Sequence, residues 1–187
     1  MIAGVLSGVL ALSTLVPYLW SIFKGTTRPS IISQTLWGST ALIVVAGQYA
    51  AEGASWSMGI ALGTIFCNVI IITVCLFGYG YVGHTKADYV SAVLAVLGVV
   101  LWQVTDAPMY GIVFAILAST CAGFPTYHKT FKHPETENPF AWAILIVSGV
   151  LSVLAAKTLT FASTVFPIFA IIEAALIVAL SLRKSRI

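Results

Sequence analysis

Two polar side chains that interrupt long apolar stretches are the residues best suited to do chemistry in this sequence. Glu173 stands in the stretch Phe169–Leu176 and Asn68 in the stretch Ile65–Val69, both otherwise apolar. A carboxylate near the middle of a membrane helix costs on the order of 3 kcal/mol to insert, so such a residue usually faces the bundle interior and has a function. Glu173 can contact a substrate or carry a proton; a purely structural hydrogen bond to a neighbouring helix is the alternative.

Asn68, Gln34 and Trp37 complete the predicted substrate-binding set. The Asn68 amide offers two donors and an acceptor, which suit a neutral solute that carries hydroxyl or amide groups. Hydrogen bonding between helices is the alternative role for this amide. Gln34 and Trp37 are three residues apart, so a helix presents them on one face. Trp37 can form a pocket wall, and core packing is the alternative for both residues.

No arrangement typical of an enzyme accompanies these residues. The sequence has no His-Glu-x-x-His, Gly-x-Ser-x-Gly or P-loop motif, and no Ser/His or paired-Asp arrangement. His128, His133, Glu135 and Glu137 crowd one predicted loop, but their spacing matches no strong metal signature, and we interpret the segment as a solvated loop. We therefore predict no enzymatic activity, no cofactor and no metal site.

The elements that carry these residues must be membrane helices. Of the 187 residues 59% are hydrophobic and only 8% are charged, against about 25% charged residues in soluble domains. This composition excludes a soluble enzyme, a nucleic-acid binder and a disordered chain. A spanning helix takes roughly 20 apolar residues, and barrel strands would alternate polar and apolar residues, which these runs do not. Hydropathy predicts seven helices in a single domain (1–187), at 2–23, 31–51, 57–79, 89–105, 108–127, 139–156 and 158–182.

Lysine and arginine positions predict how these helices are oriented. Eight of the nine lie in the odd-numbered loops or the C-terminal tail, and only Lys157 lies on the other side. Cytoplasmic loops carry the excess of Lys and Arg, so we expect an external N-terminus and a cytoplasmic C-terminus. The eight are Lys24, Arg28, Lys86, Lys129, Lys132, Arg183, Lys184 and Arg186.

Two small-residue motifs predict where helices approach closely. Gly4-x3-Gly8 and Gly59-x3-Gly63 lie in apolar segments, and such spacing lets helix backbones pack against each other. Packing within the bundle is the expected use, and packing within a homo-oligomer is the alternative.

An internal repeat relates the two ends of the chain. Pro17-x5-Phe23-Lys24 recurs 108 residues later as Pro125-x5-Phe131-Lys132, and a second proline follows each copy, at Pro29 and Pro139. Residues 2–79 and 108–182 then form two three-helix repeats, and the linker helix 89–105 makes them parallel. Transporters are commonly built from such repeats, with the substrate site between them near the midplane.

The 3+1+3 layout, the external N-terminus and the proline-centred corners resemble the PQ-loop and SWEET superfamily of seven-helix transporters. The stretches 24–29 and 133–137 are also similar to those of small bacterial seven-helix proteins. Pro17-Tyr18 and Pro125-Thr126 stand where the superfamily often has Pro-Gln. The resemblance implies that Pro17, Pro29, Pro125 and Pro139 flex at a cytoplasmic gate. The alternative is that the first proline of each pair merely ends a helix and the second merely starts one.

These observations together predict an all-α integral membrane protein, and the resemblance implies a bacterial plasma membrane. The expected function is transport of a small solute, as a facilitator or coupled to protons, by alternating access about a midplane site. A ligand-binding receptor and an auxiliary subunit without transport activity are the alternatives. The expected partners are the solute, protons, the lipid bilayer and a second copy of the chain, with no nucleic acid.

Overall fold

The computed structural model describes residues 1–80 and 85–183, and within these ranges it is helical, with no strand. Lys184 and Arg186 of the predicted charge asymmetry lie outside the described residues. The elements follow the predicted segments, with short 3₁₀ or π turns (η) at three places. They are α1 (Ile2–Ser13), α2 (Leu15–Phe23), α3 (Ile31–Glu52), η1 (Trp56–Met58), α4 (Gly59–Val74), η2 (Cys75–Tyr79), α5 (Lys86–Thr105), α6 (Pro108–Lys132), η3 (Pro134–Thr136), α7 (Pro139–Leu154) and α8 (Phe161–Ser181).

Five helical stretches of the described chain are long and apolar enough to cross a membrane. They are Ile2–Phe23, Trp56–Tyr79, Lys86–Thr105, Pro108–Lys132 and Phe161–Ser181. Two further helices, α3 and α7, are not among these five. Helix α3 has 22 residues but carries polar side chains along its length, and α7 has only 16 residues. Large apolar side chains also cover much of the outer surface of the bundle. The protein is therefore all-helical, and its long apolar helices suit a membrane-embedded chain.

Local signals explain where the helices begin and end. Ser30 caps α3 by accepting from the Ser33 amide, and Asn138 caps α7 by accepting from the amides of Phe140 and Ala141. A capping box of Thr85 and Asp88 starts α5 three residues before the predicted bound. Such caps satisfy amide groups that the first turn of a helix leaves without a partner.

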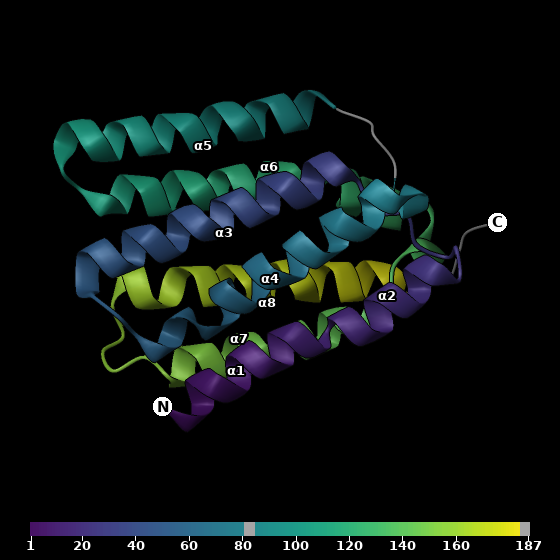
Figure 1. The fold of residues 1–187 in the computed structure, drawn as a ribbon, viewed down its shortest axis with the longest axis horizontal. Helices are drawn as coiled ribbons and strands as arrows, with labels where there is room; N and C mark the ends of the chain where they lie inside the picture. The colour runs from purple at the N-terminus through teal and green to yellow at the C-terminus, as the bar shows by residue number, and fades with distance from the viewer. Residues whose placement is uncertain (81–84, 184–187) are drawn as a thin grey trace.

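The helices form a closed ring with one helix outside it. Around the ring, α1 packs on α4, α4 on α3, α3 on α6, α6 on α8, α8 on α7, and α7 back on α1. The outlying helix α5 packs on α6 and α3, at the upper edge of the bundle in Figure 1. Most of its apolar side chains are exposed. We call each continuous helical stretch a rod, so that α1 and α2 form one rod and η1, α4 and η2 another. The described chain then has seven rods, of which six form the ring and one, α5, lies outside it.

The two ends of the bundle hold different connections (Figure 1). One end holds the N-terminus, η1 and the link between α7 and α8, and we call it the Ser57 end. The other holds the link between α2 and α3 and the link between α6 and α7, and we call it the Asn138 end. Lys157 lies in the α7–α8 link, whereas the other described lysines and arginines belong to segments at the Asn138 end.

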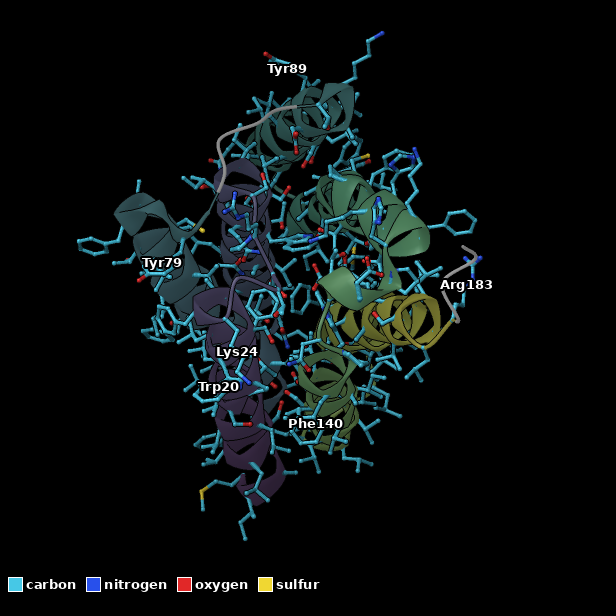
Figure 2. The ribbon with its side chains drawn as sticks, turned by 90° about the vertical axis from the view of Figure 1, so that its right-hand side faces the viewer. Trp20, Lys24, Tyr79, Tyr89, Phe140 and Arg183 are labelled. Atoms are coloured by element: carbon cyan, nitrogen blue, oxygen red, sulfur yellow. The ribbon has the colours of Figure 1, made fainter. Side chains whose placement is uncertain are left out.

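Figure 2 looks onto the Asn138 end. Here the Lys24 ammonium lies 4.7 Å from the centre of the Trp20 ring, and the Arg183 guanidinium lies 4.3 Å from the centre of the Phe131 ring. Both Trp20 and Phe131 are exposed. Basic and aromatic side chains paired at the ends of apolar helices are typical of a membrane–water interface.

The two small-residue motifs pack against each other at the Ser57 end. A Cβ atom at Gly59 would overlap the carbonyl oxygen of Gly4, and one at Gly63 would lie 2.5 Å from the Cβ atom of Ala11. The contact between α1 and α4 is thus made largely by backbone. The expected packing within the bundle is confirmed for both motifs.

Candidate functional site

A cavity of about 100 Å³ lies inside the ring of helices. A cavity holds a water molecule once roughly 10–15 Å³ of this kind of volume is present, so there is room for several waters or one small solute. All six rods of the ring contribute to its wall, and α5 does not. The lining residues are Ala11, Thr14, Leu15, Tyr18, Gln34, Trp37, Thr64, Cys67, Asn68, Ile71, Ser119, Ala141, Trp142, Leu145, Phe166, Phe169, Ala170 and Glu173.

All four residues of the predicted substrate-binding set line this cavity. Gln34 and Trp37 come from the first two turns of α3, Asn68 from the middle of the rod Trp56–Tyr79, and Glu173 from the C-terminal half of α8. The structure therefore brings together side chains separated by up to 139 positions in the sequence. Their role in binding a substrate stays a prediction.

Asn68 presents an unused acceptor to the protein interior. The residue is 4% exposed, and its Nδ2 donates to the Thr64 carbonyl at 2.8 Å. Its Oδ1 is buried and has no hydrogen-bond partner among the described residues. Leaving a buried acceptor without a partner costs about 1–3 kcal/mol, so this oxygen is a natural contact for a bound donor.

Glu173 accepts a hydrogen bond from Tyr127 of α6. The Tyr127 hydroxyl donates to Glu173 Oε1, and the contact passes over Gly123, where a Cβ atom would lie 2.8 Å from that same carboxylate oxygen. Gly123 therefore makes room for the pair. Sequence reasoning assigned no role to Tyr127, although it lies within the repeated proline motif. The extended length of α6 positions it, because the helix runs on to Lys132 instead of ending at the predicted residue 127.

Two tryptophans form one wall of the cavity. The Trp37 Nε1 donates to the Ser119 carbonyl at 3.2 Å, which joins α3 to α6. The rings of Trp37 and Trp142 meet edge to face with centroids 6.2 Å apart. The Trp142 Nε1 in turn donates to Glu137 Oε2 at 3.1 Å. The orientation of this wall is therefore set by bonds to neighbouring elements.

Glu137 corrects the interpretation of residues 128–138 as a solvated loop. Its side chain is 1% exposed and accepts from Lys129 Nζ at 2.7 Å. His133 and Glu135 are solvated as expected, with 65% of each side chain exposed. The interpretation was wrong for Glu137 because α6 continues to Lys132 and η3 follows at once, so the segment folds back over the bundle. Nothing in the local composition distinguishes this glutamate from Glu135.

The four prolines occupy two kinds of position. Pro17 lies in α2 directly after the break at Thr14 that separates α1 from α2, and Pro125 lies inside α6. The alternative that the proline merely ends a helix is therefore wrong for Pro125, whereas α1 does end at Ser13, four residues before Pro17. A proline inside a helix leaves the carbonyl four residues earlier without a partner. Pro139 is the first residue of α7, and Pro29 lies in the corner before α3. Gate motion at any of the four stays a prediction.

A second, smaller cavity lies between Pro29 and Pro125 at the Asn138 end. Its volume is about 10 Å³, and its wall includes Arg28, Lys129 and Glu137. Tyr18 and Gln34 line both cavities. These two side chains therefore stand between the central cavity and the charged residues of the Asn138 end.

Two apolar clusters border the central cavity. The first includes Ala11, Phe166 and Ala170 of the cavity wall, packed with Val44 and Ile60. The second includes Tyr18, Ile71 and Ala141 of the wall, packed with Ile22 and Cys75. Apolar packing therefore continues outward from parts of the cavity wall in both clusters.

No protein-family model matches the chain, and comparisons with the curated proteins and with the solved structures find no match. The fold and the cavity define the class of protein at a coarse level. It is an all-helical chain suited to a membrane, with a mainly apolar internal cavity whose wall includes a few polar side chains.

Proposed function

We propose that this chain is a small-solute transporter of the PQ-loop and SWEET type, working by alternating access about the central cavity. In this proposal seven helices span the membrane, with the N-terminus outside and the C-terminus in the cytoplasm. Residues 2–79 and 108–182 are parallel repeats and α5 is the linker between them. The observation that carries the proposal is the cavity itself. Among the described residues its wall has one carboxylate, that of Glu173, and one buried amide oxygen without a hydrogen-bond partner, that of Asn68.

The packing order of the ring supports the two repeats. In residues 2–79 the third rod, which contains α4, packs between α1 and α3; in residues 108–182 the third rod, α8, packs between α6 and α7. The contacts between the halves are also equivalent, because α3 meets α6 and α7 meets α1. A pseudo-two-fold axis through the cavity would relate these contacts, as expected for parallel repeats about a shared site.

Hydrogen bonds that join the two halves at both ends support alternating access. At the Ser57 end, Ser7 and Ser148 exchange hydrogen bonds at 2.8 Å, each hydroxyl donating to the other's carbonyl. At the Asn138 end, Asn138 Nδ2 donates to Ser21 Oγ at 2.9 Å and to the Pro17 carbonyl at 3.2 Å. In alternating access, the hydrogen bonds at one end break to open it while those at the other end stay formed.

The test is uptake into proteoliposomes, screened with sugars, amino acids and small metabolites at two pH values. Glu173→Gln is compared with the parent and with Glu135→Gln, which removes an exposed carboxylate. Uptake that is lost only in Glu173→Gln supports transport through this site, and dependence on a proton gradient makes it coupled. Saturable binding without uptake would replace the transporter by a ligand-binding receptor. A cavity that neither binds nor passes any solute would favour the auxiliary subunit.

Alternating access itself is tested by locking each end. In a background without the native cysteines, Ser7→Cys with Ser148→Cys should crosslink the Ser57 end, and Ser21→Cys with Asn138→Cys the Asn138 end. Each crosslink should abolish uptake, and reduction should restore it. Uptake that continues with one end locked would contradict alternating access.

A further inference from the structure

The charge of the central cavity has one sign. Glu173 is the only formally charged side chain in its wall, which contains no lysine, arginine or histidine among the described residues. Arg28 and Lys129 line the smaller cavity but not the central one, and Lys129 is paired with Glu137. An anion beside Glu173 would meet a like charge with no cation to compensate, whereas a cation would be attracted.

Several hydrogen-bond donors of the wall are already used, while two of its acceptors are open. The nitrogen donors of Asn68, Trp37 and Trp142 bond to Thr64, Ser119 and Glu137. The Thr14 hydroxyl likewise donates to the Ala11 carbonyl, and the Tyr127 hydroxyl to Glu173. Within residues 1–80 and 85–183, Asn68 Oδ1 has no hydrogen-bond partner, and the second Glu173 oxygen, Oε2, accepts no hydrogen bond. A ligand that donates hydrogen bonds therefore finds two available acceptors in this wall.

The rest of the wall is rich in aromatic rings. Five aromatic side chains line the cavity, from both halves of the ring: Tyr18, Trp37, Trp142, Phe166 and Phe169. Aromatic faces attract cations, and tryptophan does so most strongly. Cages of aromatic rings are a common way to bind quaternary ammonium groups.

From this lone carboxylate, these open acceptors and these rings we propose that the cavity binds a small organic ammonium ion. The ammonium group would lie against Glu173 and the aromatic faces, and a hydroxyl or N–H of the same ligand would donate to Asn68 Oδ1. The volume of about 100 Å³ suits a ligand of a few heavy atoms. The inference rests on the proposed function for passage across the membrane, but its first measurement is binding alone.

The test uses choline and its neutral isostere 3,3-dimethylbutan-1-ol, which has the same shape and hydroxyl but no charge. Calorimetry on the purified protein in detergent should show saturable choline binding, with the isostere at least about tenfold weaker because the charge interactions are absent. This comparison uses the parent chain, so it does not depend on the folding of any variant. Equal binding of the isostere would overturn the proposal, as would the absence of binding by choline, ethanolamine and tetramethylammonium alike.

Variants then locate the site. Glu173→Gln should weaken choline binding at least about tenfold, Trp142→Phe should weaken it about threefold, and Glu135→Gln should leave it unchanged. Unchanged affinity in a folded Glu173→Gln protein would overturn the proposal. In proteoliposomes, choline binding without uptake would refute the transport function and leave the ligand class standing. Uptake of a sugar that choline does not inhibit would support the transport function and refute the proposed ligand class.

Discussion

At the Ser57 end the helices meet through glycine backbone and serine hydroxyls. At the Asn138 end they meet through longer side chains, a partly buried ion pair and proline-containing segments. Ser7, Ser57, Ser148 and Ser152 are all fully buried, and the Ser57 carbonyl accepts from Ser152 at 2.5 Å. At the Asn138 end, Glu137 and Asn138 hold the link between α6 and α7 against α2 and the cavity wall.

This difference indicates how the two ends would resist motion. Close backbone contact is stiff, because dispersion contacts are lost as soon as two surfaces separate by a fraction of an ångström. Contacts between long polar side chains can be exchanged for water with less change in packing. We therefore expect packing substitutions to be most damaging at the Ser57 end, and charge or hydrogen-bond substitutions to act mainly at the Asn138 end.

The largest expected effect comes from Gly59→Val. Its added atoms would meet the Gly4 backbone, which cannot move without separating α1 from α4. The free energy of unfolding should fall by about 3 kcal/mol, at the upper end of overpacking costs. Thermal and SDS-induced unfolding in detergent measure this loss. Ala92→Val, which adds methyl groups on the exposed surface of α5, is the control; equal losses in both variants would contradict a tight Ser57 end.

Glu137→Gln should have the next largest effect. It leaves Lys129 without its partner at a partly buried site, while an amide oxygen can still accept from Trp142. Because Lys129 is 29% exposed, we expect a loss of about 2 kcal/mol, less than for a fully buried pair. Glu135→Gln should change stability by less than about 0.5 kcal/mol.

A double-mutant cycle sharpens this prediction. With Glu137→Gln present, adding Lys129→Gln should cost little more, because the ion pair is already broken. Full additivity in the unfolding measurement would show that the two side chains do not interact.

Asn138→Ala should cost about 1.5 kcal/mol. It removes the cap of α7 and the hydrogen bonds to Pro17 and Ser21 together. Asn138→Asp keeps an acceptor for the cap but loses the amide donor, so it should recover only part of the loss. A complete rescue by aspartate would mean that the hydrogen bonds from Asn138 to α2 contribute nothing to stability. Those bonds would then no longer support closure of the Asn138 end.

Ser148→Ala should have the smallest effect, about 0.6 kcal/mol, because hydrogen bonds between membrane helices contribute little on average and alanine preserves the close contact. The same unfolding measurement applies, with Thr73→Ala on the exposed face of α4 as the control. A loss above about 2 kcal/mol would mean that hydrogen bonding, and not packing, closes the Ser57 end.

Several features could be read from local sequence because their causes are local. Hydropathy located the seven helical segments, and every bound except the end of α6 lies within three residues of the structure. Asn138 and Pro139 are ordinary starting signals for α7. The polar residues Asn68 and Glu173 stood out because their neighbours are apolar, and both line the cavity. The extension of α6 through Pro125 was missed because a proline predicts a helix end unless packing compensates for the lost hydrogen bond.

The sequence by itself determined the membrane-like composition, the helical segments and the separation of Lys157 from the other basic residues, because each depends only on hydrophobic period, length and residue type. Tertiary structure alone decided that Tyr127 bonds to Glu173, that Glu137 is buried beside Trp142 and that the glycines of α1 face those of α4. These pairings depend on the rotation and crossing of helices far apart in the chain. Small residues at the contacts allow the helices to cross closely, but their rotation and crossing are decided only when all the helices of the ring pack together.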